Sequence, residues 1–553
     1  LSITGMFSFD TYNYTSNRFT KSPNTYHATG RDANGNLIYE QTRQGTENLA
    51  YSLSAKGDRT IYLEAALNYK NTFGRHDVSG MLLFNQSDEI NTKATNVEEA
   101  LPYRFRGLAG RFTYGFDDRY FAEFNFGYNG SENFTPKNRY GFFPSVGLGW
   151  VISNESFFEP LTNVIQYLKV RGTWGQVGNS QISGRRFAYL ATVTDSSSTS
   201  YTFGKNMDQN YGTTAIDEYA VDVTWEVADK TDIGVDMRLL NNKLNLQFDY
   251  FKESREGIYL RRSSIPSYVG MINNPYGNIG KVENKGFELS VNYANSWGGD
   301  WSLSLMGNYS FNRNKVLEDD STVVYPWQNT IGNKVGQRFG LVALGLFESY
   351  GEIAASPVQT GDTRPGDIKY KDVNGDGKID EYDKVPIGWG SVPEIMYGFG
   401  FSVGWKNLSL TAMFQGAAHV DAMLSGEGVL PFSQGSSRGN LLSNITDRWT
   451  EENPRQNAFY PRLSIGNINM NYEESTWWLK DTDYLRLKNI ELSYRLPDRW
   501  MKRIHLSNAR IFIQGVNLLT FSSFKIWDVE LGDGRGAKYP NIASVSLGIN
   551  FNF

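Results

Sequence analysis

The sequence contains no cysteine and only four histidines among its 553 residues. The lack of cysteine excludes disulfides, thiol catalysis and cysteine-ligated metals, and so few histidines argue against a histidine-rich metal centre. No stretch approaches ~18 consecutive apolar residues, so neither a transmembrane helix nor a hydrophobic signal segment is predicted. The net charge of −5 argues against a general nucleic-acid-binding protein.

What the sequence does contain is a strict alternation of apolar and polar residues, clearest in its last eleven residues, ASVSLGINFNF. Odd-numbered positions from Val545 to Phe553 are apolar, and even-numbered positions from Ser544 to Asn552 are polar or glycine. Successive side chains of a β-strand point to opposite faces, so the pattern predicts a strand with one apolar face. That face would meet the core of a soluble sandwich or the lipid around an outer-membrane barrel.

Similar alternating runs recur in pairs along the whole chain, separated by short turn sequences. Three examples are the turns at Asp117-Asp118, Asn241-Asn242 and Lys406-Asn407. Alternation on both sides of a short turn predicts a β-hairpin. Helical periodicity is limited to a short segment near residues 155–165, so the predicted fold class is all-β.

The short turns alternate with long connections. The predicted connections are residues 13–60, 87–107, 176–225, 252–284, 314–393, 416–481 and 520–542. Hairpins that are tight at one end and long at the other are typical of an antiparallel transmembrane β-barrel with short periplasmic turns and long extracellular loops. Counting the alternations gives roughly sixteen strands, the last of which ends on the periplasmic side.

The polar positions of these strands predict the surface of the barrel lumen. Most carry small side chains, and charges are scattered among them at Glu64, Arg111, Glu123, Asp236 and Asp249. A barrel of so many strands encloses a wide lumen. Something must occupy this lumen, because an open one would leak solute.

The sharpest local motif is DVNGDGKIDEYD, residues 372–383, within the predicted connection 314–393. Its spacing is that of an EF-hand calcium loop, with candidate ligands Asp372, Asn374, Asp376, Lys378 (through its carbonyl), Asp380 and Asp383. Asp383 replaces the usual glutamate, so its reach for bidentate binding is shorter. The motif predicts a structural Ca²⁺ or Mg²⁺ that braces this loop, and the alternative is a solvated acidic turn.

No other motif carries recognisable chemistry. The sequence shows no Ser-His-Asp order, zinc spacing or nucleotide-binding loop, so neither an enzyme nor an organic cofactor is predicted. The glycine-rich stretch 532–538 lacks the strand-to-helix context of a phosphate loop. Trp477 and Trp478 suit either sugar stacking or loop anchoring, and no substrate-binding residue is assigned.

Several stretches together resemble the SusC/RagA family of TonB-dependent outer-membrane transporters of Bacteroidetes. They include RYGFFPSVGLGWVISNE (139–155), YLKVRGTWGQVGN (167–179), TWEVADKTDIGVDMRLLNNKLNLQFDYF (224–251), GNIGKVENKGFELSVNY (277–293), PGDIKYKDVNGDGKIDEYDKVPIG (365–388), YLRLKNIELSYRLP (484–497) and the closing strand. The resemblance implies an N-terminal plug domain, a TonB-contacting segment and about 22 barrel strands. Residues 1–553 show neither plug nor TonB segment, so they resemble the C-terminal part of such a barrel.

The resemblance also implies a function. It implies TonB-dependent import of oligosaccharides or oligopeptides across the outer membrane of a Gram-negative bacterium. The implied partners are a SusD-like surface lipoprotein, the TonB–ExbB–ExbD system acting through an N-terminal region, and a second transporter–lipoprotein pair in a dimer. The alternatives are a passive porin, a surface adhesin and, last, a soluble all-β binding protein.

Overall fold

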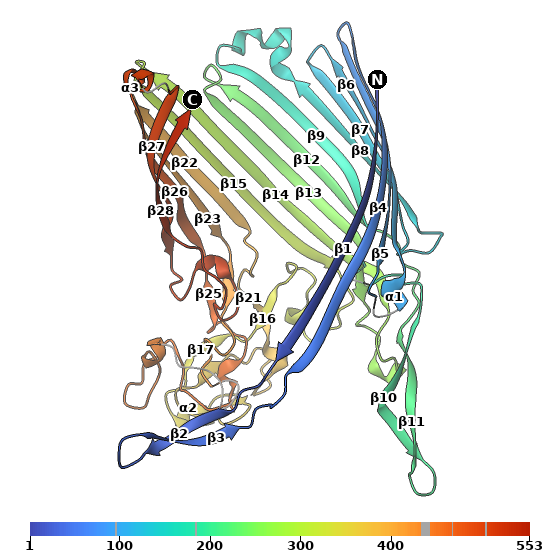
Figure 1. The fold of residues 1–553 in the computed structure, drawn as a ribbon, viewed down its shortest axis with the longest axis vertical. Helices are drawn as coiled ribbons and strands as arrows, with labels where there is room; N and C mark the ends of the chain where they lie inside the picture. Colours follow the sequence, from blue (N-terminus) through green and yellow to red (C-terminus); the bar gives the residue numbers. More distant parts are fainter. Residues whose placement is uncertain (95–96, 183–184, 433–442, 467, 504–505, 553) are drawn as a thin grey trace.

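The fold is dominated by one sixteen-stranded antiparallel sheet that curves around an open interior (Figure 1). The structure is a computed structural model that describes residues 1–94, 97–182, 185–432, 443–466, 468–503 and 506–552. The strands follow one another in chain order: β1 (Ser2–Thr20), β4 (Ala50–Phe73), β5 (His76–Asn91), β6 (Tyr103–Phe116), β7 (Tyr120–Ser131), β8 (Tyr140–Val151), β9 (Ile165–Asn179), β12 (Glu226–Leu239), β13 (Leu244–Arg261), β14 (Tyr276–Trp297), β15 (Trp301–Glu318), β22 (Ile395–Trp405), β23 (Leu408–Ala418), β26 (Tyr484–Arg495), β27 (Asn508–Ser522) and β28 (Ser544–Asn552). The predicted all-β fold and strand number are confirmed.

The register keeps the apolar positions of neighbouring strands together on one face. In the β27–β28 pair, Ile511 lies opposite Ile549 and Ile513 opposite Leu547. In the β12–β13 pair, Val235 lies opposite Phe248. Since side chains alternate along each strand, the polar positions line up on the other face.

Tight turns join the strands at one end of the sheet, as predicted. The backbone is left-handed at Asp117 (φ 54°), Asn241 (φ 57°) and Lys406 (φ 55°), a conformation that Asp and Asn adopt more readily than most residues. Two connections at this end are longer than expected: residues 152–164 contain η1 (Ile152–Asn154) and η2 (Ser156–Leu161), and residues 496–507 contain α3 (Asp498–Arg503). The helical segment predicted near 155–165 is therefore a 3₁₀ helix.

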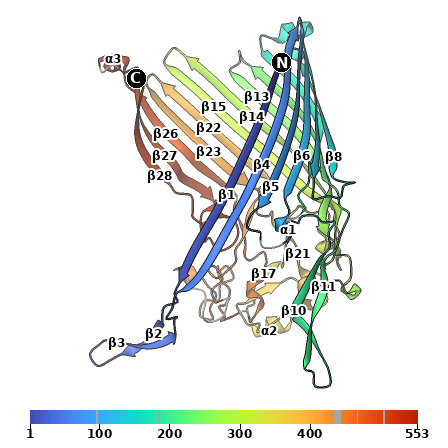
Figure 2. The same ribbon diagram turned by 45° about the vertical axis from the view of Figure 1, so that its right-hand side comes forward.

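The opposite end carries the long connections, at the bottom of Figures 1 and 2. They contain β2 (Thr25–Arg31), β3 (Leu37–Arg43), α1 (Val97–Ala100), β10 (Thr192–Phe203), β11 (Gln209–Glu218), η3 (Ser267–Val269), η4 (Pro326–Gln328), β16 (Arg338–Gly340), β17 (Ala343–Leu346), α2 (Tyr350–Ala354), β18 (Val358–Gln359), β19 (Ile368–Tyr370), β20 (Lys378–Ile379), η5 (Glu381–Asp383), β21 (Val385–Ile387), β24 (Asp421–Met423), η6 (Ser443–Thr446), η7 (Met470–Tyr472), β25 (Leu479–Asp481) and η8 (Val529–Leu531). In the described part of the chain, none of the helices has the length and apolar character needed to cross a membrane.

Several strands run further into these connections than the sequence predicts. The predicted connection 13–60 begins and ends inside β1 and β4, and 252–284 begins and ends inside β13 and β14. The hydrogen-bond ladder continues there although the apolar alternation has stopped. Pairing of the backbone does not require an apolar face, so the apolar pattern underestimates strand length.

Candidate functional site

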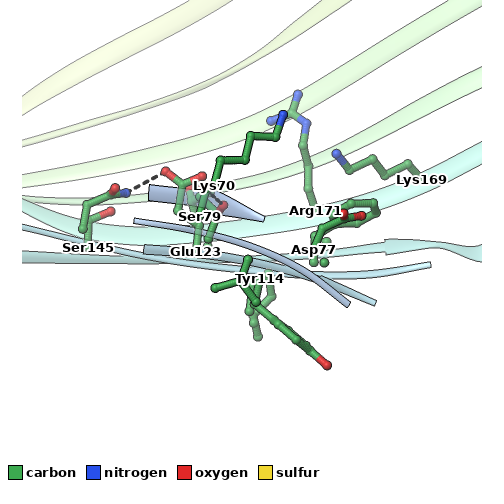
Figure 3. A pocket seen from close by; sticks show the side chains of 18 of the residues that line it. Lys70, Asp77, Ser79, Tyr114, Glu123, Ser145, Lys169 and Arg171 are labelled. Atoms are coloured by element: carbon green, nitrogen blue, oxygen red, sulfur yellow. Dashed lines mark hydrogen bonds between the residues drawn. The ribbon is translucent and has the colours of Figure 1, made fainter. Parts of the chain in front are cut away.

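The polar face of the sheet contains a recess of 700 Å³ near the tight turns, lined by strands β4 to β9 (Figure 3). Its side chains share one face because Thr113 lies opposite Glu123 and Glu123 opposite Gly147 in the register. The side chains of Lys70, Lys169 and Arg171 project from one face of the sheet, whereas that of Tyr114 projects from the opposite face (Figure 3). Arg111 donates to Glu123 at 3.0 Å. The recess therefore has polar side chains along its lining, with charges of both signs.

Arg171 organises the charges next to this recess. Its guanidinium lies 3.0 Å from Asp232 and 3.4 Å from Asp236, and it also pairs with Asp249 two strands away. It reaches Asp249 by crossing Gly234, where an added Cβ would lie 2.3 Å from an Asp249 oxygen. The glycine therefore makes a three-strand ion cluster sterically possible.

The other face of the same strands is apolar and exposed. Phe84, Leu108, Tyr128 and Phe142 form one cross-strand row, and all four side chains are exposed. Towards the tight turns, Trp297, Trp301 and Trp405 form a second aromatic group. An apolar band between two aromatic rows is the surface that a membrane barrel presents to lipid.

Three long connections, residues 319–394, 419–483 and 523–543, pack into a single unit that we call the loop assembly. Its core is made of side chains from all three connections, among them Tyr370, Trp478 and Phe524. Trp478 is 1% exposed, and its indole nitrogen donates to the Asn471 carbonyl at 2.7 Å. Such a core is that of a small water-soluble domain.

Ion pairs hold the loop assembly together. Arg462 donates to the buried Asp367 at 2.9 Å, which joins two segments of the core. Arg338 lies 3.3 Å from Asp421 and 2.7 Å from Asp533, so one guanidinium contacts both of the other connections. These pairs fix the three connections relative to one another.

Two further ion pairs join the loop assembly to the sixteen-stranded sheet, which we call the wall. Arg486 of β26, whose side chain is 3% exposed, donates to Asp528 at 2.7 Å and to Glu530 at 2.6 Å. Burial alone would raise the pKa of Asp528, but the hydrogen bonds from Arg486 and from the Glu530 and Asn541 amides hold it below its usual value.

Two buried groups of the loop assembly titrate in the opposite direction. Burial raises the pKa of Asp421, although the amides of Trp389 and Gly390 and the Arg338 guanidinium oppose that effect. Burial likewise raises the pKa of the Tyr370 hydroxyl. These shifts follow from the dry interior of the loop assembly and indicate packing rather than catalysis.

The first half of the predicted metal loop forms a tight turn. Asp372 accepts hydrogen bonds from the amides of Gly375 (2.6 Å) and Gly377 (2.9 Å). Asn374 accepts from the Asp376 amide at 3.0 Å and donates to the Asp376 carboxylate at 3.1 Å. Gly375 and Gly377 both have left-handed backbones (φ 76° and 82°). The first three candidate ligands are thus close together around one turn.

The second half folds back on the first. Asp383 is fully buried and accepts from the amides of Val373 (2.7 Å) and Asp380 (2.9 Å). Asp380 caps η5 by accepting from the Tyr382 amide at 2.8 Å, and Lys378 begins β20. Within the described ranges, no three acidic, histidine or cysteine side chains are arranged as around one metal ion. The Ca²⁺ or Mg²⁺ site therefore stays a prediction.

Comparison with known proteins identifies the family. The sequence model of the "TonB dependent receptor-like, beta-barrel" family matches residues 2–518. The chain belongs to this family. It is 28% identical to the TonB-dependent receptor P3 of Formosa agariphila, over 80% of the chain and 45% of that receptor. It is 27% identical to the TonB-dependent receptor SusC of Bacteroides thetaiotaomicron, over 80% of the chain and 43% of SusC.

Solved structures agree on the fold. The RagAB peptide transporter matches with a TM-score of 0.71 and 20% identity, over 100% of this chain and 60% of the other. The barrel is therefore SusC/RagA-like, which confirms the predicted resemblance. The chain spans about half the length of the curated relatives it matches.

The sequence located part of this site. Arg111 and Glu123, predicted to face the lumen, lie on the recess wall or pair with it, and Asp236 and Asp249 join the Arg171 cluster. Arg171 itself was not predicted, although it has the same parity along β9 as the polar residues Lys169 and Thr173. Apart from the metal motif and the loop-anchoring option for Trp477 and Trp478, the loop assembly gave no sequence signal, because its contacts join distant segments.

Proposed function

We propose that this chain is the C-terminal barrel part of an importer that carries oligosaccharides or oligopeptides across the outer membrane of a Gram-negative bacterium. In this proposal the long connections are extracellular and the C-terminus is periplasmic. TonB, ExbB and ExbD drive transport through an N-terminal plug and TonB-contacting region, and residues 1–553 have no catalytic role.

The observation that carries the proposal is the polar face of the sheet from β4 to β23. Its groups are hydroxyls, amides, glycine backbone and paired charges. Such groups bind the hydroxyls of a sugar or the amides of a peptide weakly and at many places. Transport needs this kind of binding, because a solute must leave each site as readily as it enters.

The loop assembly supports a role for a second protein. Its three connections share one core and are cross-linked by Arg338, so they present a single preformed surface at the extracellular mouth. We infer that a SusD-like lipoprotein closes over this surface and delivers the substrate. Two such pairs associate as a dimer in this proposal.

The loop of residues 372–383 adds a structural cation to the proposal. Trp327 donates to the Tyr382 carbonyl at 2.8 Å and Gln328 to the Glu381 carbonyl at 3.0 Å, so another part of the same long connection rests on this loop. A bound Ca²⁺ or Mg²⁺ would stiffen that contact by ordering the loop's oxygens.

The test is purification of the full-length protein in mild detergent from the outer membrane of its native host, followed by mass spectrometry of co-purifying chains and bound small molecules. We expect a lipoprotein and trapped oligosaccharide or oligopeptide. A lone barrel with steady conductance in a planar bilayer would contradict the proposal in favour of a porin. A barrel that retains host-surface ligands and imports nothing would favour an adhesin.

A further inference from the structure

A small pocket of 170 Å³ lies at the long-connection end of β5 to β8. Its lining includes Gln86, Arg104, Arg106, Arg139 and Tyr140. In the register, Gln86, Arg106, Gly130 and Tyr140 form one cross-strand row. Each member of that row lies two residues along its strand from a member of the exposed apolar row, so both rows lie on the same face. The apolar row consists of Phe84, Leu108, Tyr128 and Phe142. The pocket is therefore at the edge of the lipid-facing band, on the side of the extracellular loops.

The pocket holds more cationic than anionic groups. Arg104 donates to Asp88 at 2.8 Å and lies 3.9 Å from Glu132, so its charge is paired. In the described part of the chain, Arg106 donates only to the amide oxygen of Gln86, at 3.1 Å. Among the described residues, neither Arg106 nor Arg139 has a carboxylate partner, and the Arg139 Nε atom is buried without a hydrogen-bond acceptor. Two guanidinium groups thus lack an anion.

Aromatic rings form one side of the pocket. The Tyr140 ring lies over Gly130, where an added Cβ would be 2.4 Å from a ring carbon. It also stacks on Tyr128, with 5.2 Å between ring centroids and an interplanar angle of 16°. Tyrosine collects at membrane interfaces because its ring suits acyl chains and its hydroxyl suits headgroups.

We propose that this arginine pocket binds the phosphate of a lipid headgroup in the outer leaflet around the barrel. Guanidinium groups bind phosphate oxygens with two parallel hydrogen bonds, so Arg106 and Arg139 match this anion in charge and in shape. A lipid is the source because the pocket adjoins the lipid-facing band and its aromatic edge. The inference rests on the proposed membrane location but not on the imported substrate.

A matched control lies on β13 to β15. Lys252, Lys285 and Arg313 form a cross-strand row just beyond the aromatic residues Tyr250, Phe287 and Phe311. These cations already have anions: Glu283 lies 2.8 Å from Lys252 and 3.5 Å from Lys285, and Glu394 lies 2.6 Å from Arg313. Each of these three cations therefore lies beside a carboxylate, which Arg106 and Arg139 do not within the described ranges.

The experiment uses the full-length protein in detergent micelles and compares R106Q/R139Q with K285Q by native mass spectrometry. The probes are phosphatidic acid, phosphatidylcholine and inorganic phosphate. We expect the double variant to bind phosphatidic acid about tenfold more weakly, as the loss of a charge-assisted bond implies. K285Q should bind like the wild type, and phosphatidylcholine should bind more weakly to all three proteins.

Folding and function are monitored separately. Heat-dependent migration in gel electrophoresis reports barrel folding, and uptake of the native nutrient should be unchanged in folded R106Q/R139Q. Equal loss of phosphatidic acid binding in both variants, or no loss in either, would overturn the proposal. Inorganic phosphate that binds as tightly as phosphatidic acid would assign the pocket to a soluble anion instead. If the double variant fails to fold, R106K/R139K gives the same comparison, because lysine keeps the charge but loses the paired hydrogen bonds.

Discussion

The barrel wall and the loop assembly are stabilised in different ways. In the described part of the chain, the twelve largest fully buried side chains all lie outside the sixteen strands of the sheet, and nine of them lie in the loop assembly. The wall instead has a continuous backbone ladder, an exposed apolar face and a polar face with ion clusters. The comparison shows that one chain combines a structure built for lipid with one built for water.

The difference predicts opposite sensitivities to substitution. In the loop assembly, a truncated side chain leaves a cavity in a packed core. In the wall, a truncated side chain is replaced by lipid or water, whereas an added atom on the polar face disrupts a close ion cluster. This contrast can be tested in the full-length protein.

The largest effect is expected for Trp478→Ala in the loop-assembly core. The change should destabilise the loop assembly by about 3–5 kcal/mol, as is usual when a buried tryptophan is truncated. Hydrogen exchange of residues 319–394 and 419–483 would measure this, while heat-dependent gel migration should show an intact barrel. Trp301→Ala is the control, because that side chain is 50% exposed in the aromatic group near the tight turns. Equal exchange in both variants would contradict the contrast.

Removal of divalent cations should have the next largest effect, again confined to the loop assembly. If the loop binds Ca²⁺, a Ca²⁺ concentration about one hundred times the dissociation constant should stabilise it by about 2–3 kcal/mol. Hydrogen exchange of residues 372–383 with and without EGTA measures this. In Asp376→Ala the response should be lost. An exchange rate that is independent of Ca²⁺ and Mg²⁺ would show that the motif is a solvated acidic turn.

On the wall, Gly234→Ala should lower the stability of the barrel by about 1–3 kcal/mol, because the new methyl group would displace Arg171 from Asp249. The midpoint of urea-induced unfolding in detergent measures the change. Gly172→Ala on the adjacent strand is the matched control, since the added Cβ would lie 4.0 Å from the Asp232 carbonyl oxygen, an ordinary contact distance. If both variants shift equally, the cause is strand propensity and not the ion cluster.

The smallest effect is expected when the pH is lowered. It should appear at the Arg486–Asp528 ion pair, which joins the wall to the loop assembly. The pKa of Asp528 is held below its ordinary value of 3.8, so its ion pair with Arg486 contributes stability above that pH. The contribution is lost as the pH falls through the lower folded-state pKa. The protection of the amides of residues 523–543, measured as exchange relative to the intrinsic rate at each pH, should therefore fall below about pH 4, and Asp528→Asn should remove this dependence. Unaltered acid sensitivity in that variant would point to another carboxylate.

Much of the wall was predictable from the sequence because its determinants are local. A period-two pattern gives strand, face and approximate register, and paired short turns give the hairpins. Arg171 could also have been predicted to face the lumen, because it lies on the same face of its strand as Lys169 and Thr173. What the pattern missed was the continuation of β1, β4, β13 and β14 past the apolar band, where both faces meet water and no alternation is required.

The loop assembly was not predictable for the opposite reason. Arg338 and Asp533 are 195 positions apart, and Asp367 and Arg462 are 95 apart. Patterns in the spacing of nearby residues cannot predict contacts between positions so far apart. The metal motif was the one part of this region that local spacing indicated, because all its candidate ligands lie within a single turn and the residues after it.

The Arg338 contacts constrain how relatives of this barrel can diverge. One guanidinium binds carboxylates from two other connections, so replacing residues 319–394 alone would remove the cation that faces the buried Asp421. New sequences in this region are therefore easier to acquire by exchanging all three connections together. A chimaera that carries only residues 319–394 from a relative should fold as a barrel but leave its mouth disordered.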